Sequence, residues 1–498
     1  MTLEHLVGDA RTLAIVCNQW GDTGKGKFVD YFAAVWADIV ARGTGGANAG
    51  HTIVVDGKQL ILHLIPSGIQ HDHAGKINVI GTGVAVDPRE VIKELTTLDA
   101  ANVSYNNLMI AHDAKLVLPQ HLLIERLKEM LAGKKKIGTT GRGIGEVYGD
   151  HVLRVGLTVN DLLNPDRFRE KLARNLQAKM PFLRSFDRDT LEAMLQTPAL
   201  GDGTFFDKEH LLNSEAIIDA YLRYGQTLDR FVHDTKAFLR ERLGKSKILL
   251  EGAQGFLLSI DHGAHPYVTS SDCSIQGLAR GVGLREHEVD KVLGIVKAFY
   301  MTRVGEGAFP TEFGGEQSAT WCEAHKRGEE EAQFPDVSVN DPDPFRQGIA
   351  IRRAGHEYGA TTGRPRRTGW LDLPLLRAAA AVNGREVILT KVDVLNDCED
   401  ITICTHHHYK GPEIRRGKQQ ISDGALFDHA LVQDDILRHC EPVYQTFPGW
   451  MSDISACRTY EALPAKLRVI LEYVERTASV RVRMIGVGPE RHQTIFKP

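Results

Sequence analysis

The chain reads Asn18-Gln19-Trp20-Gly21-Asp22-Thr23-Gly24-Lys25-Gly26-Lys27 directly after the apolar run Leu13-Ala14-Ile15-Val16. An apolar run that ends in glycines and leads into helically spaced apolar residues, from Phe28 to Val35, predicts a strand, a turn and a helix. In such a unit the backbone N–H groups at the start of the helix face an anion. The stretch therefore predicts a phosphate-binding loop, in which Lys25 supplies a cation for the outer phosphates.

The loop matches the ordinary P-loop pattern only in part. Gln19 stands where that pattern has its first glycine, and Gly26 stands where it has the Ser or Thr that binds Mg²⁺. A metal ion must therefore find its oxygen ligands elsewhere, and the nearest candidate is the carboxylate of Asp22. That carboxylate suits Mg²⁺, and it also suits a base beside the γ-phosphate. The alternative interpretation is a glycine-rich turn with a capping aspartate.

A second glycine-rich loop, Gly43 to Thr52, ends in His51 and precedes the β-branched run Ile53-Val54-Val55. Glycines let a ligand approach the backbone closely. An imidazole titrates near neutral pH, so His51 is a candidate for donating to a phosphate oxygen or a leaving group. The alternative is a structural histidine.

Length and composition narrow the class of protein. A chain of 498 residues, 42% hydrophobic and 25% charged, can bury a large core as one enlarged domain or as two. A formal net charge of −4 argues against nucleic-acid binding as the main function. Seven scattered cysteines without Cys-x-x-Cys spacing predict reduced thiols in the cytoplasm. No apolar segment is long enough to span a membrane, so we expect no membrane-spanning helix.

Short apolar runs alternate with helical patterns along the chain, which favours an α/β fold with a large, mostly parallel central sheet. We expect a single domain over residues 1–498, with a helical subdomain at 158–245 and an exposed insertion at 314–356 that contains Glu329-Glu330-Glu331. A further irregular piece is expected near 405–435. The predicted strands are Leu13–Val16, Ile77–Ile80, Asn107–Ile110, Ile248–Leu250, Val292–Lys297, Val387–Thr390 and Val482–Val487.

Two histidine clusters, His71-x-His73 and His406-His407-His408, raise the question of a metal site. Neither has cysteine or carboxylate partners at ligand spacing in the sequence. We therefore predict solvated histidines in a turn or strand at both places.

The chain resembles the adenylosuccinate synthetase family in seven long segments that occur in the same order. One glycine loop is a weak signal, whereas seven ordered motifs along nearly the whole chain are specific. The segments are Gln19–Lys27, Asn48–Thr52, Ile137–Gly145, Glu251–Ser271, Thr302–Gly307, Gly359–Trp370 and Leu389–Leu395.

The resemblance implies a GTP-dependent ligase that joins IMP and L-aspartate into adenylosuccinate, with GDP and phosphate as the other products. This is the first committed step from IMP to AMP, and it proceeds through 6-phosphoryl-IMP. The 6-oxo group of a purine leaves poorly until it is phosphorylated, so a base must first take the N1 proton. The resemblance assigns catalysis to Asp22, His51, Lys25 and Gln254, and one Mg²⁺ to Asp22 and the carbonyl of Gly50.

The resemblance also assigns residues to each substrate and implies a homodimer, because Arg154 falls where the family has an arginine that reaches the IMP phosphate of the neighbouring subunit. The GTP set is Gly21, Gly24, Lys25, Gly26, Lys27, Gly50, His51, Thr52, Lys391, Asp393, Gly488 and Pro489. The IMP set is Asp22, Asn48, Thr140, Arg154, Gln254, Thr269 and Arg364. The aspartate set is Thr361, Thr362, Arg364 and Arg366.

Two alternatives stay open at this point. Thr23 and Asp272 stand where the family usually has Glu and Asn, so a paralogue with another purine or amino-acid substrate is one of them. A non-catalytic GTP-binding protein is the other, although it would not need the Thr361–Arg366 loop or the Gln254–Thr269 segment.

Overall fold

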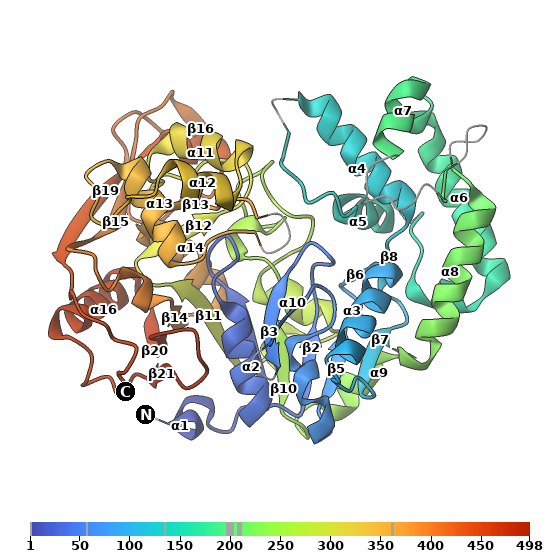
Figure 1. Ribbon diagram of the computed structural model, residues 1–498, viewed down its shortest axis with the longest axis horizontal. Helices are drawn as coiled ribbons and strands as arrows, with labels where there is room; N and C mark the ends of the chain where they lie inside the picture. The colour runs from blue at the N-terminus through green and yellow to red at the C-terminus, as the bar shows by residue number, and fades with distance from the viewer. Residues whose placement is uncertain (1, 56–57, 134–135, 196–203, 207–211, 360–362) are drawn as a thin grey trace.

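The computed structural model describes residues 2–55, 58–133, 136–195, 204–206, 212–359 and 363–498. A ten-stranded sheet crosses the molecule with helices on its faces, which confirms the predicted α/β class (Figure 1). Among its strand pairs, β20–β21 is antiparallel and the others are parallel. In spatial order the strands are β21 (Thr494–Phe496), β20 (Arg481–Gly486), β14 (Glu386–Thr390), β11 (Lys291–Lys297), β1 (Thr12–Cys17), β10 (Ile248–Glu251), β2 (Ile39–Arg42), β5 (Ile77–Ile80), β7 (Leu108–Ala111) and β9 (Val232–His233).

Strand β1 is apolar at every position because both of its faces are covered. Leu13 and Ile15 pack into the cluster that contains Phe28 and Phe32 of α2 (Lys25–Val35). Ala14 and Val16 point to the other face, where they meet the cluster of α9 (Thr235–Arg242) and α10 (Ile275–Gly281). The apolar pattern predicts that Val35, at the end of α2, is buried, but its side chain is 51% exposed.

The remaining helices around this sheet cover both of its faces and its ends (Figure 1). They are α1 (Leu3–Val7), α3 (Pro88–Ala100), α9 (Thr235–Arg242), α10 (Ile275–Gly281), α14 (Leu373–Asn383) and α16 (Ala465–Ala478), with the short turns η1 (Ser67–Ala74), η5 (Asp229–Phe231), η6 (Phe256–Leu258), η7 (Glu286–Glu288) and η8 (Val392–Leu395). Short two-stranded pieces are β3 (His51–Val55) with β4 (Lys58–Leu62), and β6 (Ala85–Val86) with β8 (Lys115–Leu116).

A separate group of helices stands beside one end of the sheet and has its own hydrophobic cluster (Figure 1). This cluster starts earlier than the predicted 158–245 region, since it includes Leu122, Leu123 and Ile144. Helix α9, within the predicted region, instead packs on the sheet through Leu239. The amphipathic patterns predict these helices but do not reveal which surface each one covers. The group comprises α4 (Pro119–Ala132), α5 (Ile144–Leu153), η3 (Val159–Leu163), α6 (Pro165–Leu183), α7 (Arg188–Leu195) and α8 (Ser214–Leu228).

A second sheet carries the helices of the predicted 314–356 insertion. Its strands are β12 (Tyr300–Arg303), β13 (Arg367–Asp372), β15 (Asp400–Tyr409), β18 (Leu426–Phe427) and β19 (Cys440–Pro448), and the helices are α11 (Gly315–Ala324), α12 (Arg327–Gln333) and α13 (Pro344–Ala354). The segment is not simply exposed. Glu330, expected at the surface, is fully buried and accepts hydrogen bonds from Trp321 (2.9 Å), from Tyr358 (2.7 Å) and from Arg352.

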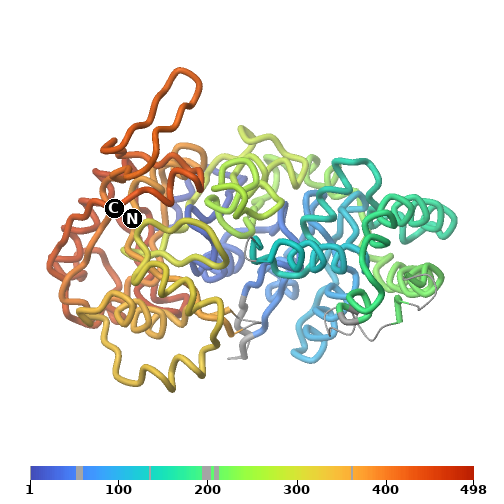
Figure 2. The backbone as a smooth tube through the Cα atoms, turned by 90° about the horizontal axis from the view of Figure 1, so that it is seen from above, coloured from blue at the N-terminus to red at the C-terminus, as the bar shows by residue number. Residues whose placement is uncertain are grey.

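The 405–435 piece continues β15 and includes β16 (Ile414–Arg416), β17 (Gln419–Ile421) and, just beyond, α15 (Asp434–Leu437). The β16–β17 hairpin projects from the body of the molecule (Figure 2). The prediction that its histidines are solvated is wrong for His407, whose side chain is 1% exposed and pairs with Asp372. His71 is likewise mostly covered and pairs with Asp30, whereas His73 is exposed as predicted.

All seven cysteines are free thiols, and six of them are buried. Within the described ranges, no helix combines the length and the apolar character that a membrane crossing requires.

Candidate active site

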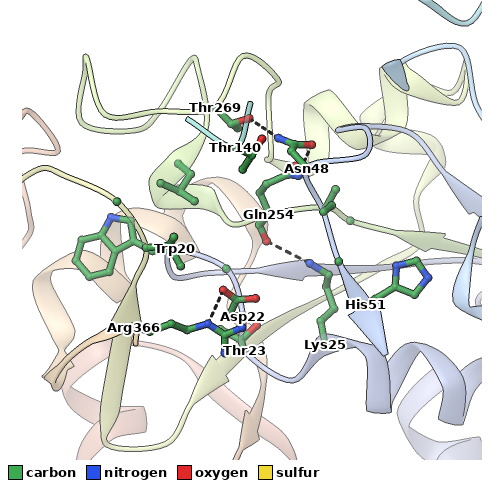
Figure 3. Close-up of a pocket in the computed structure, with 18 of the residues that line it drawn as sticks. Trp20, Asp22, Thr23, Lys25, Asn48, His51, Thr140, Gln254, Thr269 and Arg366 are labelled. Atoms are coloured by element: carbon green, nitrogen blue, oxygen red, sulfur yellow. Dashed lines mark hydrogen bonds and ion pairs between the residues drawn. The ribbon is translucent and has the colours of Figure 1, made fainter. Parts of the chain in front are cut away.

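A cavity of about 820 Å³ opens along the edge of the main sheet where the parallel strands end. Loops that follow β1, β2, β10, β14 and β20 line it, because parallel strands bring their carboxyl ends to one edge. Thr139 and Thr140 face it from the segment before α5, so the cavity lies between the sheet and the helical group (Figure 3).

The glycine-rich loop after β1 forms the floor of the cavity. Gly24 caps α2 in the left-handed conformation (φ 73°), and no side chain caps the first N–H groups of the helix. Those N–H groups therefore face the cavity beside Gly26, as an anion site requires. The Nζ of Lys25 donates to the carbonyl of Gln254 at 3.2 Å, which holds the ammonium group over the loop (Figure 3).

Asp22 projects into the cavity from the same loop, with about a third of its side chain exposed. It adopts a left-handed backbone conformation (φ 52°), which a residue with a side chain adopts at a cost of about 1–3 kcal/mol. Its Oδ2 lies 3.0 Å from the Nε of Arg366, which arrives from the second sheet (Figure 3). The pair joins the phosphate loop to the Arg-rich loop that precedes β13.

A row of neutral polar groups crosses the opposite wall of the cavity. Gln254 donates to the Oδ1 of Asn48 at 3.0 Å, and Asn48 donates to the Oγ1 of Thr269 at 3.3 Å (Figure 3). Gln254 also has a left-handed backbone (φ 50°), and its buried Oε1 lacks a hydrogen-bond partner among the described residues. A buried acceptor without a partner indicates a place for a ligand donor.

Gly255 lets the Gln254 loop approach the phosphate loop. A Cβ at this position would lie 2.2 Å from the carbonyl oxygen of Gln19 and 2.4 Å from the nitrogen of Gly21. Any side chain would therefore push the two loops apart and widen the distance between Lys25 and the amide row.

His51 begins β3 and lines the cavity from the second glycine-rich loop. Burial lowers the pKa of His51 to about 4, with Glu251 opposing that shift and Arg42 adding to it. The ring is therefore neutral at pH 7 and can donate one hydrogen bond. Its buried Nε2 lacks a partner within the described part of the chain, so a bound group could supply one.

The far end of the cavity is formed by Lys391, Asp393, Gly488 and Pro489. Burial raises the pKa of Asp393. Lys27, which the resemblance assigns to GTP, lines the cavity and donates to the carbonyls of Gly488 (2.7 Å) and Gln493 (2.9 Å), so it fastens the turn after β20. This turn and the loop after β14 lie side by side because β14 pairs with β20.

A buried carboxylate, Glu357, connects the two ends of the cavity, and the sequence reasoning missed it. Its oxygens lie 2.8 Å from Lys297, 2.6 Å from Lys391 and 2.9 Å from Arg366, and the hydroxyl of Tyr300 donates to it at 2.8 Å. Burial alone would raise the pKa of Glu357, but the three cations outweigh it and hold the pKa well below the usual range. Burial also lowers the pKa of Lys297 to about 7, although Glu357 opposes this.

We expect Glu357→Gln to destabilise the fold by about 3–5 kcal/mol, because it removes the anion from a buried group of three cations. Urea unfolding, followed by tryptophan fluorescence, measures the change. The matched control is Glu316→Gln, at an exposed position of α11, which should leave the midpoint unchanged. Equal stability of the two variants would show that the cations are neutralised by other groups.

A family model described as adenylosuccinate synthetase matches residues 14–495, nearly the whole chain. The chain belongs to the adenylosuccinate synthetase family.

Relatives and solved structures agree with this assignment. The adenylosuccinate synthetases of Chlorobium chlorochromatii and Halothermothrix orenii are each 41% identical to this chain, over 490 and 483 residues. The first alignment covers 97% of this chain and 96% of the relative, and the second covers 97% of each. The fully ligated adenylosuccinate synthetase of Plasmodium falciparum superposes with a TM-score of 0.78 at 30% identity, over 98% of this chain and 100% of that one.

A succinoaminodeoxyadenylate synthetase of cyanophage S-2L shares the fold at a TM-score of 0.53 and 18% identity, over 98% of this chain and 95% of that one.

Most residues that the adenylosuccinate synthetase resemblance assigned line the one cavity. Among the described residues, Arg154 and Arg364 do not: Arg154 is exposed at the end of α5, and Arg364 is exposed in the loop before β13. Thr361 and Thr362 lie outside the described residues. The backbone of Thr52 lies in β3.

The two departures from the adenylosuccinate synthetase pattern differ in their surroundings. Thr23 lines the cavity, and its backbone carbonyl accepts a hydrogen bond from Thr390 at 2.7 Å. Asp272 is buried away from the cavity, where it accepts hydrogen bonds from Ser259 and from the backbone of Ser274, both at 3.0 Å.

Proposed function

We propose that this protein is a GTP-dependent ligase that joins IMP and L-aspartate to form adenylosuccinate, GDP and phosphate, the first committed step from IMP to AMP. One observation carries the proposal. A single cavity contains a phosphate loop with a carboxylate, a row of neutral polar groups and, at its far end, the side chains of Lys391 and Asp393. Membership of the family supports it.

The first chemical step is transfer of the γ-phosphoryl group to the 6-oxygen of IMP. Asp22 takes the N1 proton, which makes the 6-oxygen nucleophilic, and Arg366 holds the carboxylate in place. Lys25, the N-terminus of α2 and neutral His51 contact the phosphates, since such a transfer depends mainly on positioning and charge neutralisation. The α-amine of aspartate then displaces phosphate from C6 of 6-phosphoryl-IMP.

A divalent cation fits the donor groups that Asp22 and Gly50 present to the cavity. A carboxylate oxygen and a backbone carbonyl are hard ligands of the kind that Mg²⁺ takes together with phosphate oxygens and water. When bound, Mg²⁺ would neutralise charge on the transferring phosphoryl group.

For IMP, we assign Asn48, Gln254, Thr269 and Thr140, because amides and hydroxyls orient a base and ribose without neutralising one another. For L-aspartate, we assign Arg366 together with Arg364, Thr361 and Thr362 of the loop before β13. The two carboxylates of that substrate call for guanidinium groups.

Asp393 reads guanine in this proposal, because a carboxylate accepts both the N1–H and the 2-amino group, and adenine offers neither donor there. We expect Asp393→Asn to lower the GTP-to-ATP ratio of kcat/KM by roughly 5- to 150-fold, equivalent to about 1–3 kcal/mol for a buried group left unpaired. Asp397→Asn, an exposed carboxylate four residues further on, is the control and should keep the ratio. An unchanged ratio in Asp393→Asn would show that guanine is read elsewhere.

A homodimer, in which Arg154 enters the neighbouring subunit's site, completes the proposal. Arg154 directly follows α5 and does not line the cavity of its own chain. The side chains of the two residues before it, Val152 and Leu153, are 74% and 66% exposed. Adjacent exposed aliphatic side chains at a helix end are what a partner subunit would cover.

Difference absorbance in the ultraviolet tests the reaction directly. The purine spectrum should change when GTP, IMP and L-aspartate are all present, and omission of any one of them should abolish the change. A GTP-binding protein without catalytic activity would give no change in any mixture. A paralogue would respond only when IMP or aspartate is replaced by a related purine nucleotide or amino acid.

A further inference from the structure

Four residues outside the active-site cavity lie on the neighbouring strands β13, β15 and β19 of the second sheet. Asp372 ends β13, Cys404 and His407 lie in β15, and Cys440 begins β19. These strands are direct neighbours: Asp372 pairs with Cys404, and Cys440 pairs with Tyr409. None of the four has a role in the proposed reaction.

An irregularity in β15 places Cys404 and His407 on the same face. Residues three positions apart in a regular strand point to opposite faces. Here Cys404 pairs with Tyr444 while His406 pairs with Val443, so Thr405 is an additional residue in β15. A bulge of this kind changes the direction of the following side chains and is common at functional positions.

The ligand atoms of Asp372, Cys404 and His407 all lie within 4.8 Å of one another, and all three residues are buried. The Nε2 of His407 is 2.7 Å from the Oδ2 of Asp372. Its buried Nδ1 has no hydrogen-bond partner among the described residues, although the ring is 1% exposed. The thiols of Cys404 and Cys440 lie beside the same ring.

We propose that Asp372, Cys404 and His407 bind a Zn²⁺ ion, with Cys440 as the nearest further donor. Thiolate, imidazole and carboxylate are the ligands that zinc takes in proteins, at about 2.0–2.3 Å, which puts neighbouring ligand atoms roughly 3–4 Å apart. The observed spacings bracket that range: the ligand atoms of His407 and Asp372 are 2.7 Å apart and would separate slightly, and no separation among the three exceeds 4.8 Å. One thiolate, one carboxylate and a neutral imidazole also cancel the charge of Zn²⁺, which suits a buried position.

The site would be structural, because its three donors come from the paired strands β13 and β15 and the cavity lies elsewhere. The ion would fasten β13, which follows the Arg-rich loop of the active site, to β15, and Cys440 would add β19 as a further donor strand. This inference does not depend on the proposed ligase reaction.

Metal analysis of the full chain tests the site. The protein is purified without a polyhistidine tag and without chelator, and zinc is measured by mass spectrometry. We expect about one zinc per chain, and a loss to below roughly a tenth of that in Cys404→Ser and His407→Gln. After zinc is removed, titration with Co²⁺ should give a thiolate-to-cobalt charge-transfer band in the native sequence and not in Cys404→Ser.

Two controls separate this site from others. His406→Gln changes the neighbouring histidine, on the opposite face of β15, and should keep the zinc. Asp22→Asn should also keep it, since zinc adventitiously bound in the active-site cavity would be lost there. Circular dichroism checks folding, and Cys404→Ser, which leaves the Asp372–His407 pair intact, keeps the test valid in case His407→Gln does not fold.

A native protein that contains no zinc and gives no thiolate-to-cobalt band would overturn the proposal and leave a metal-free His–Asp ion pair. Zinc that remains in a folded Cys404→Ser variant would also overturn it, because the ion would then be bound elsewhere.

Discussion

Asp22→Asn is expected to reduce turnover by roughly 10²–10⁴-fold, and further if a metal ligand is lost with the base. The amide cannot accept the N1 proton of IMP. The backbone of the phosphate loop and Lys25 are unchanged, so GTP should still bind. The rate is measured by ultraviolet absorbance with all three substrates, and the affinity for GTP by titration calorimetry.

Two comparisons make this result specific. Asp9→Asn, an exposed carboxylate at the end of α1, should keep full activity. Urea unfolding of Asp22→Asn should show native stability, which excludes global damage from loss of the Arg366 pair. Activity of Asp22→Asn within tenfold of the native rate would remove Asp22 from the role of base.

The fold was predictable where burial leaves a local pattern. The central strands, such as Leu13–Val16 and Val387–Thr390, are covered on both faces, so they appear as short apolar runs. The glycine-rich loops were predictable for a related reason, because close approach to another backbone excludes side chains, as at Gly255.

The connections between distant segments were not predictable. Glu357 lies 60 residues from Lys297 in sequence, and nothing local indicates that the two charges meet in the interior. The bulge at Thr405 arises from pairing with β19, so no local pattern indicates that His407 is buried beside Asp372. Amphipathic helices show the same limit: the pattern predicts a buried face for α9 but does not identify the sheet as its partner.

The contacts of Lys27 were not predictable either. Nothing local indicates that a lysine beside a phosphate loop has a distant partner, yet its ammonium group fastens the turn at Gly488 and Gln493. Burial lowers the pKa of Lys27 to about 8, although Asp393 and Glu490 oppose this. Lys27 thus positions the turn at the far end of the cavity. Its partner Gly488 lies 461 positions away in the sequence, so only the folded chain reveals the contact.

Mixed dimers of Asp22→Asn and Arg154→Leu are expected to recover activity that neither variant has alone. If Arg154 crosses a two-fold interface, the Arg154→Leu chain keeps an intact Asp22 loop and receives an intact arginine from the Asp22→Asn chain. Isologous symmetry requires both arginines to cross, so random equimolar mixing gives about half mixed dimers, each with one complete site of two. Recovered activity should approach roughly a quarter of the native value in the unfractionated mixture and about half in purified mixed dimers.

The experiment uses co-expression of differently tagged chains and tandem purification of the mixed species. Arg174→Leu, which removes another exposed arginine of the helical group, is the matched control. Alone it should be fully active, and a mixed dimer with Asp22→Asn should have half the native activity, because each Arg174→Leu chain keeps a complete site. If purified mixed dimers of Asp22→Asn and Arg154→Leu are as inactive as their parents, Arg154 serves its own chain or none. Since Arg154 does not line its own cavity, that outcome would also remove it from the IMP set.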